Sequence, residues 1–167
     1  MYLQSIEDIR KVGDLARSYL WDILIEKGGG APPPAPFNEW FPAVSVSEPI
    51  ASIHAEPIPI PINPFNAPRS MAPRQLSVTF VDTQDHRLGK WLENWIKNEI
   101  FGGGLYVATL DVACKDITIV KMNHQRQKVS AIKYTCFPVG DPAHDWNSDN
   151  HAKTITVNFP IVGETPA

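Results

Sequence analysis

The sequence predicts an α+β domain, mainly antiparallel β, with one long amphipathic helix packed on a curved sheet or barrel. Five apolar residues follow the i, i+3, i+4, i+7, i+8 spacing of one helical face, namely Leu88, Trp91, Leu92, Trp95 and Ile96. Three β-rich runs follow, at about 116–122, 128–137 and 153–161, with polar turn segments between them. We expect the five side chains to be buried against their own sheet, although the two tryptophans could instead form an aromatic platform for single-stranded nucleic acid.

At the N-terminal end, the spacing predicts a short helix followed by a strand. Ser5 and Asp8 resemble a capping box, and the apolar residues up to Val12 lie on one helical side. Over 18–26, one face is apolar at period two, while Asp22 and Glu26 share the other face. That alternation is typical of a half-buried strand, which we expect to end at a flexible, proline-rich turn.

The segment 28–73 is unusual in its proline content. It holds twelve of the 16 prolines, and its only charged residues are Glu39, Glu48, Glu56 and Arg69. We expect one or two extended segments over 40–55. Beyond them, Ile58, Ile60 and Ile62 alternate with prolines, which cannot donate hydrogen bonds to a neighbouring strand. This stretch is therefore predicted to form an edge or a protruding arm.

The second half of the chain has clearer patterns. Apolar residues alternate with Ser77 and Thr79, which predicts a strand over 76–82. Asp82 or Thr83 can then cap the long helix, and Gly102–Gly104 ends it. Because the chain has no internal repeat, we predict one domain over 1–167, with the proline-rich arm at about 28–73.

Composition argues against several classes of protein. The 167 residues carry 15 basic and 18 acidic side chains, a formal charge of −3, which argues against a broad nucleic-acid-binding face. No apolar run approaches the roughly 18 residues of a membrane-spanning helix, and the start of the chain lacks a signal-peptide pattern, so we expect no membrane insertion and no Sec export. Cys114 and Cys136 are too few for a disulfide framework and are expected to be reduced strand residues.

A polar segment near the C-terminus contains residues that could bind a metal. Three of them have the spacing of the first EF-hand ligands: Asp145, Asn147 and Asp149. However, Asn150 stands where that loop needs glycine, and Thr156 stands where it needs glutamate. His144 and His151 could bind zinc with the same carboxylates, but no zinc motif accompanies them. We therefore interpret 141–151 as an Asx-rich hairpin turn and expect no metal site.

A catalytic site has weak support. Asp85 and His86 could be drawn into a triad with Ser70 or Ser77, but the chain has no GxSxG nucleophile elbow. We expect no catalytic residue and no cofactor.

Several local patterns occur in an order known from one family. Gly13–Arg17 precedes the strand over 18–26, and the strand over 76–82 precedes Asp85 and the long helix. The most specific part is the C-terminal third, where Ala113–Asp116, the strand pair through Cys136, the turn 137–140, the segment 145–150 and the closing strand follow one another. This order resembles the tail tube proteins of contractile-tail bacteriophages, a family related to the tubes of contractile bacteriocins and type VI secretion.

The resemblance implies a tail-tube-like β-barrel or sandwich that assembles with copies of itself. Subunits of that family form hexameric rings, neighbouring sheets join into a continuous inner barrel, and the rings stack into a tube inside a sheath. The implied partners are therefore other copies, the tail sheath, and baseplate, initiator or terminator proteins, with phage DNA passing transiently during ejection. The implied location is the virion tail, after assembly in the host cytoplasm. Since each copy has a net negative charge, a channel that repels DNA is expected.

Within such a tube, the arm is expected to contact a neighbouring subunit in the next ring. The apolar residues assigned to this contact are Ile58, Ile60, Ile62 and Phe65. Arg69 and Arg74 would flank it and pair with acidic groups across it. The alternative is an arm that folds back on its own barrel.

Other functions stay open from the sequence alone. One is a baseplate tube initiator of the same fold. Two others belong to different classes, an oligonucleotide-binding barrel and a small hydrolase built on His86 or His144.

Overall fold

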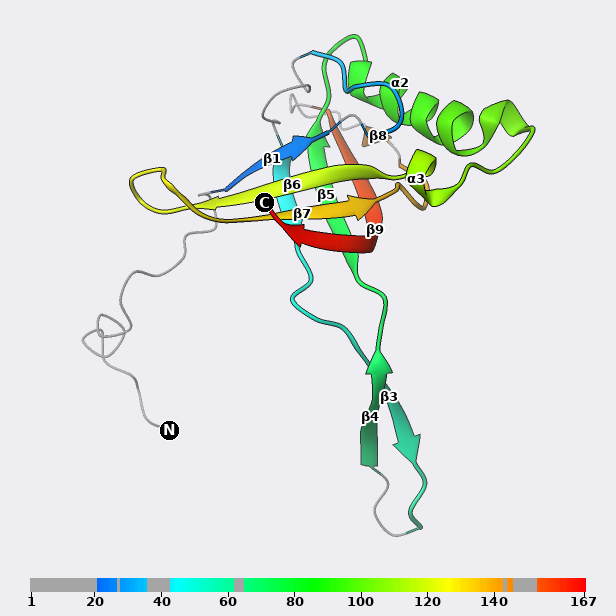
Figure 1. The fold of residues 1–167 in the computed structure, drawn as a ribbon, viewed down its shortest axis with the longest axis vertical. Helices are drawn as coiled ribbons and strands as arrows, with labels where there is room; N and C mark the ends of the chain where they lie inside the picture. The colour runs from blue at the N-terminus through cyan, green and yellow to red at the C-terminus, as the bar shows by residue number, and fades with distance from the viewer. Residues whose placement is uncertain (1–20, 27, 36–42, 62–64, 143, 146–152) are drawn as a thin grey trace.

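The computed structural model describes residues 21–26, 28–35, 43–61, 65–142, 144–145 and 153–167 (Figure 1). The helix expected over 5–12 and most of the segment 141–151 lie outside these ranges. The fold is α+β and mainly antiparallel β, as the sequence predicts. Its elements are β1 (Trp21–Ile25), β2 (Ala43–Ser47), β3 (Ile53–Ile58), β4 (Phe65–Met71), β5 (Gln75–Val81), α2 (Arg87–Asn94), a π-helical turn (Trp95–Ile100), a 3₁₀ turn (Gly102–Gly104), α3 (Leu110–Ala113), β6 (Lys115–Met122), β7 (Lys128–Cys136), β8 (His144–Asp145) and β9 (Thr154–Pro166).

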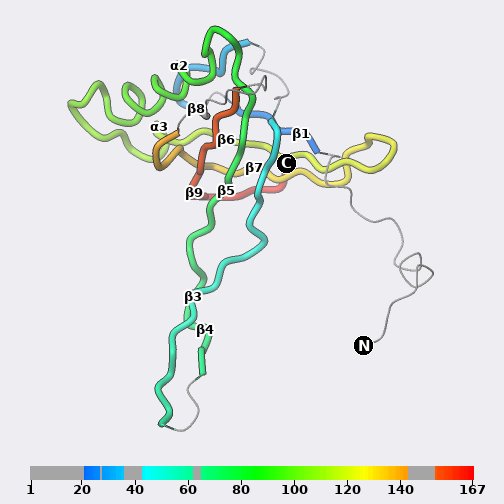
Figure 2. Tube along the Cα trace, turned by 180° about the vertical axis from the view of Figure 1, so that it is seen from behind, coloured from blue at the N-terminus to red at the C-terminus, as the bar shows by residue number. Residues whose placement is uncertain are grey.

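One antiparallel sheet curls into a nearly closed barrel. Its strand order is β1-β6-β7-β9-β5-β2, and β8 pairs with the start of β9. A separate two-stranded sheet, formed by β3 and β4, projects away from the barrel between β2 and β5 (Figures 1 and 2). The predicted edge or protruding arm is therefore a projecting hairpin, and we call residues 53–71 the hairpin.

Strand β9 belongs to two layers of the barrel. Its first half, Thr154 to Pro160, pairs with β5, whereas Ile161 to Pro166 pairs with β7. We call β2, β5 and the first half of β9 the axial layer, because they run along the direction of the hairpin in Figure 1. The transverse layer consists of β1, β6, β7 and the second half of β9, which cross that direction.

The core lies between the two layers. Period-two alternation points one side of each strand inward, and the inward residues are almost fully buried: Ile23, Ile25, Leu76, Val78, Phe80, Ile117, Ile119, Tyr134, Ile155, Val157 and Phe159. Each large apolar side chain buried in this way contributes about 1.5–3 kcal/mol relative to an exposed one. This contribution makes the two-layer barrel the stable unit to which the hairpin is attached.

The long helix begins at a carboxylate cap, as the sequence predicts. Asp82 Oδ1 accepts hydrogen bonds from the backbone N–H groups of Thr83 (2.8 Å) and Leu88 (3.0 Å), and Asp82 Oδ2 accepts one from Gly89 (3.2 Å). Thr83 Oγ1 accepts another from the N–H of Arg87 at 3.2 Å. The first-turn N–H groups thus have partners, and the charge lies at the positive end of the helix dipole.

The helix does not bury all five residues of its predicted apolar face. Leu88, Trp91, Leu92 and Trp95 are buried, but Ile96 is only half-buried, which differs from the prediction. The reason is the π-helical turn from Trp95 to Ile100, whose i to i+5 bonds place residues five apart on one face. Ile100, five residues after Trp95, is therefore the buried residue of the last turn.

Candidate functional site

The hairpin presents apolar side chains to solvent. Ile58 lies directly opposite Phe65 in the β3–β4 register, and these side chains are 39% and 51% exposed. Ile60, just beyond β3, is 44% exposed, and Ile62 lies outside the described residues. A two-stranded hairpin with exposed apolar residues is only marginally stable in water by itself. Contact with another protein surface would remove this apolar area from water.

Both arginines assigned to this surface have partners within their own chain. Arg69 forms an ion pair with Glu56 across the hairpin. Arg74, at the base of the hairpin, lies with Nη2 2.7 Å from Oε2 of Glu164 on β9. The first pair is largely exposed, so it adds little to stability and either residue can change partner.

The sheet has two terminal strands. Among the described strands, β1 pairs only with β6, and β2 pairs only with β5. Each therefore has a second edge that no described strand covers. Unpaired edge groups can add a strand from another chain.

The structure places both tryptophans of the helix in the core. The Trp95 side chain is fully buried, and its indole Nε1 donates a hydrogen bond to the Ala113 carbonyl at 2.8 Å. Trp91 is 6% exposed, and its Nε1 donates to the carbonyl of Ala31 at 3.2 Å. In these positions neither ring can stack on a nucleic-acid base, so they provide no support for the oligonucleotide-binding alternative.

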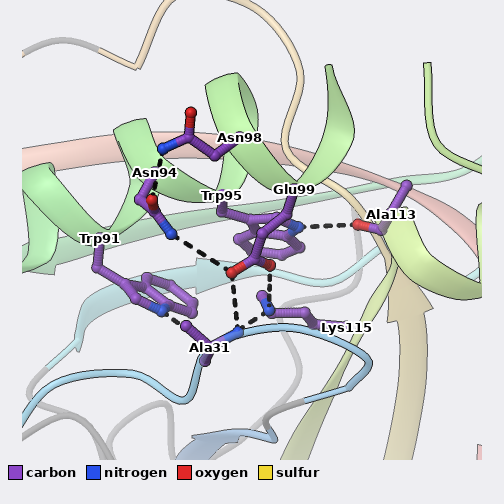
Figure 3. A network of polar contacts seen from close by, with 8 residues as sticks. All are labelled: Ala31, Trp91, Asn94, Trp95, Asn98, Glu99, Ala113 and Lys115. Carbon is purple, nitrogen blue, oxygen red and sulfur yellow. Dashed lines mark hydrogen bonds and ion pairs between the residues drawn. The ribbon is translucent and has the colours of Figure 1, made fainter. Parts of the chain in front are cut away.

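A buried ion pair lies beneath these tryptophans (Figure 3). Lys115 Nζ is 2.7 Å from Glu99 Oε2, and the lysine side chain is entirely buried. The ammonium lies 5.1 Å from the ring centroid of Trp95 and 5.7 Å from that of Trp91, within cation–π range. Sequence reasoning did not find this pair, because a lysine in an alternating strand is normally expected on the exposed face.

The same pair holds the glycine-rich segment after β1. Glu99 Oε1 accepts a hydrogen bond from the Ala31 N–H at 2.8 Å, and Lys115 Nζ donates to the Ala31 carbonyl at 3.3 Å. A Cβ on the preceding residue, Gly30, would come within 1.9 Å of Glu99 Oε2. Only glycine at position 30 leaves room for the Glu99 carboxylate, which explains why the run Gly28–Gly30 ends in glycine.

A second exposed apolar surface follows the helix. It includes Leu105 (88% exposed), Tyr106, Val107 and Leu110, within the connection to β6. Apolar side chains exposed in sequence order are more typical of an interface than of a free surface.

The residues considered for catalysis are dispersed. His86 lies before α2, with Nδ1 2.7 Å from Lys153 Nζ, whereas Ser70 lies in the projecting hairpin and Ser77 lies within β5 opposite Asn158. A cavity of about 460 Å³ lies along the exposed side of the helix and includes Ile96, Lys90 and Lys153 in its lining. Within the described ranges, no group of three or more His, Cys, Asp or Glu side chains is placed to hold a metal.

Both cysteines are buried and unpaired. Burial raises the pKa of the Cys136 thiol and, to a smaller extent, that of Cys114. Burial also raises the pKa of Tyr134, whose hydroxyl donates a hydrogen bond to Glu48. These groups are uncharged structural components of the core at neutral pH.

The helices of the described part of the chain include none with the length and apolar character that a bilayer crossing requires.

Comparison with solved structures places the fold among tubes of contractile systems. A chain of the sheath/tube terminator of the extracellular contractile injection system PVC, in the extended state, matches with a TM-score of 0.62 at 16% identity, covering 93% of this chain and 99% of that one. A chain of the PVC sheath–tube complex, also in the extended state, matches with a TM-score of 0.59 at 15% identity, and the match covers 99% of both chains. The tube-terminating cap of the anti-feeding prophage matches with a TM-score of 0.58 at 14% identity, covering 92% of this chain and 91% of that one. No protein-family model and no curated protein sequence matches the chain. At these identities, what is shared is the tail-tube-like fold.

Proposed function

We propose that this chain is a structural subunit of the inner tube of a contractile tail, stacking as hexameric rings to form the channel for DNA ejection. The observation that carries the proposal is the projecting hairpin with its exposed isoleucines and Phe65. A free-standing protein gains nothing from such a projection, whereas a stacked ring can bury it against the next ring.

Ring formation is supported by the terminal strands β1 and β2. Their uncovered edges carry backbone donors and acceptors that a neighbouring copy can pair, which also protects the sheet from non-specific aggregation. A head-to-tail contact of this kind closes into a ring when the rotation between copies is a simple fraction of a turn. We propose that the free edge of β2 pairs with a neighbouring copy in this way.

The hairpin then supplies the contact between rings. Ile58, Ile60, Ile62 and Phe65 would be buried on the neighbouring ring, with Arg69 and Arg74 at the margin. The proline residues of the hairpin reduce the conformational entropy lost on docking, because they restrict the free arm. Within a single tube domain spanning 1–167, we propose that the hairpin is the stacking part of the proline-rich segment 28–73.

Further partners follow from this assignment. We propose that the outer side of the tube meets a tail sheath, that phage DNA passes through without stable binding, and that the protein is located in the virion tail after assembly in the host cytoplasm. The role is structural, with no catalytic residue and no cofactor.

A second candidate is a protein at one end of the tube. Two of the structures named above are a sheath/tube terminator and a tube-terminating cap, which supports a terminator as the alternative to a repeated subunit. A baseplate initiator of the same fold is the corresponding candidate for the other end.

Electron microscopy tests the proposal and separates its two forms. Purified wild-type protein, alone and with the sheath and baseplate proteins of the same tail, is expected to form rings or tubes of repeated subunits. Immunogold labelling along the whole tail would identify a repeated tube subunit, and labelling at one end only would identify a terminator or initiator. A protein that stays monomeric in the presence of all these components contradicts the proposed function.

A further inference from the structure

We infer that the channel wall of the tube is the outward face of the axial layer, an uncharged surface of hydroxyl and amide side chains. The inference rests on the proposed function, since it asks which surface of a ring-forming subunit faces the channel. It also replaces the expectation of an acidic, DNA-repelling channel with that of a neutral one.

The direction of the hairpin identifies the layer. The hairpin continues β2 and β5 outward along the long dimension of the molecule (Figures 1 and 2). If the hairpin reaches the next ring, this direction approximates the tube axis. Strands that close side by side into a barrel are typically tilted by roughly 35–45° from its axis and do not run across it. β2 and β5 run along the hairpin direction, whereas β6 and β7 cross it, so the axial layer is the one whose strands can line a channel along that axis.

The two sides of the axial layer differ in chemistry. The inward side is fully apolar and packs on the core. The outward residues of its three strands include a continuous group of uncharged polar side chains: Ser45, Ser47, Ser77, Thr79, Thr156 and Asn158. Thr79 and Thr156 lie opposite each other, with their hydroxyl oxygens 3.0 Å apart. The remaining outward positions of β5 and of this half of β9, Gln75, Val81, Thr154 and Pro160, are also uncharged.

Charged residues gather instead on the outward face of the transverse layer. Lys133 Nζ lies 2.7 Å from Glu26 Oε2 and 3.8 Å from Asp116 Oδ2, and Thr135 donates a hydrogen bond to Asp116. Asp22 of β1 lies opposite Val120 of β6 and, by the period-two alternation of the strands, on the same face as Glu26 and Asp116. With the axial layer at the channel, this charged face belongs to the outer part of the ring.

A wall of hydroxyl and amide groups has a definite consequence for cargo. It holds water by hydrogen bonds but provides neither counter-charges for a polyanion nor fixed repulsion against one. Passage would therefore depend on the size of the cargo and only weakly on its charge or on the salt concentration.

Cysteine labelling of assembled tubes tests which face lines the channel. Ser77→Cys places a thiol on the inferred wall by a nearly isosteric change. Lys97→Cys places one on the outer side of the helix, where Lys97 is 68% exposed. Wild-type tubes are the blank, because Cys114 and Cys136 are buried. Each tube is treated with a small maleimide and with a large polyethylene glycol maleimide that cannot enter the channel, and the dissociated subunits are treated in parallel.

The expected result is selective protection from the large reagent. In tubes without sheath, Ser77→Cys should react with the small reagent but several-fold more slowly with the large one, and Lys97→Cys should react with both. Dissociated subunits of either variant should react with both. Tubes in which the large reagent modifies Ser77→Cys as fast as Lys97→Cys overturn the inference while leaving the proposed function intact. If no tubes form under any condition, the proposed function and this inference fail together.

A charge introduced on the wall provides an independent readout. Thr156→Lys tubes should retain a short oligonucleotide at low salt and release it as salt is raised, whereas wild-type tubes should retain none. Retention by wild-type tubes at the same salt would contradict a neutral wall.

Discussion

Trp95 on the helix stacks on Phe159 of β9, with ring centroids 6.1 Å apart and an interplanar angle of 28°. This contact joins the helix to the strand that both layers share. Because Trp95 also donates to the Ala113 carbonyl, one side chain connects the helix, β9 and the segment before β6.

Truncation of Trp95 should therefore destabilise the isolated subunit. Trp95→Ala is expected to cost about 3–5 kcal/mol, since it removes a fully buried aromatic side chain and leaves a cavity. Trp95→Phe should cost less, about 1–3 kcal/mol, because it keeps the stacking but leaves the Ala113 carbonyl without its donor. Chemical denaturation measures both values, and equal effects of the two variants would contradict this account.

Two adjacent glycines offer a matched test of the anchored segment. Gly30→Ala should lower stability by about 1–3 kcal/mol, because its new Cβ forces Glu99 away from Lys115 and Ala31. At Gly29, the nearest atoms to a new Cβ are 3.5 Å away, an ordinary contact distance. Gly29→Ala should thus leave the unfolding midpoint nearly unchanged. Similar losses in the two variants would show that the effect is not due to the Glu99 contact.

Alkaline pH should destabilise the fold through its two buried thiols and the buried phenol of Tyr134. The pKa values of Cys136, Cys114 and Tyr134 are raised in the folded state above their ordinary values of 9.0 for the thiols and 10.0 for the phenol. The unfolded chain therefore loses protons first, so the free energy of unfolding should fall as the pH rises above about 9. The stability associated with these groups is fully present at neutral pH.

Thermal unfolding between about pH 8 and pH 10.5 measures this slope. Cys136→Ala should lower the midpoint at every pH but reduce its decline with pH. A decline as steep as that of the wild type would exclude Cys136 as a source of the effect.

Removal of the hairpin tip should separate folding from assembly. A variant in which residues 57–68 are replaced by a short glycine linker should keep its circular dichroism spectrum and thermal transition, because the hairpin lies outside the core. It should nevertheless fail to lengthen into tubes. Glu56→Gln with Arg69→Gln is the control, since it removes an exposed ion pair in the same hairpin and should leave both properties nearly unchanged. Loss of the folded state in the shortened variant would mean that the hairpin supports the barrel itself.

Sequence patterns predicted the elements whose two sides face different environments. Strand β5 and the helix are half-buried, so Leu76 and Leu88 recur at the periods of a strand and a helix. The pairing of β3 with β4 was not predictable in this way, because nearly all residues of the hairpin are exposed and neither of its faces is buried. Local patterns also did not predict contacts between distant elements, such as the ion pair of Lys115 with Glu99. They likewise did not predict the π-helical turn, which buries Ile100 in place of Ile96.

The end of β9 shows a further limit of local reasoning. The sequence predicts a strand ending near Ile161, yet β9 continues to Pro166. The alternation of buried and exposed residues along β9 changes where its pairing partner changes from β5 to β7. A register shift next to Cys136 marks this point. A partner exchange of this kind depends on the three-dimensional course of the sheet, and no residue type marks it.

The continuity of β9 also determines how the subunit responds to mechanical load. A force applied to the hairpin enters the barrel through β2 and β5, and the hydrogen bonds between β5 and β9 transmit it to β9. From there it passes along the covalent backbone of β9 into the second layer, where hydrogen bonds transmit it to β7. The two layers therefore cannot be pulled apart by unzipping one hydrogen-bonded ladder. Under tension the axial and transverse layers should yield as one mechanical unit.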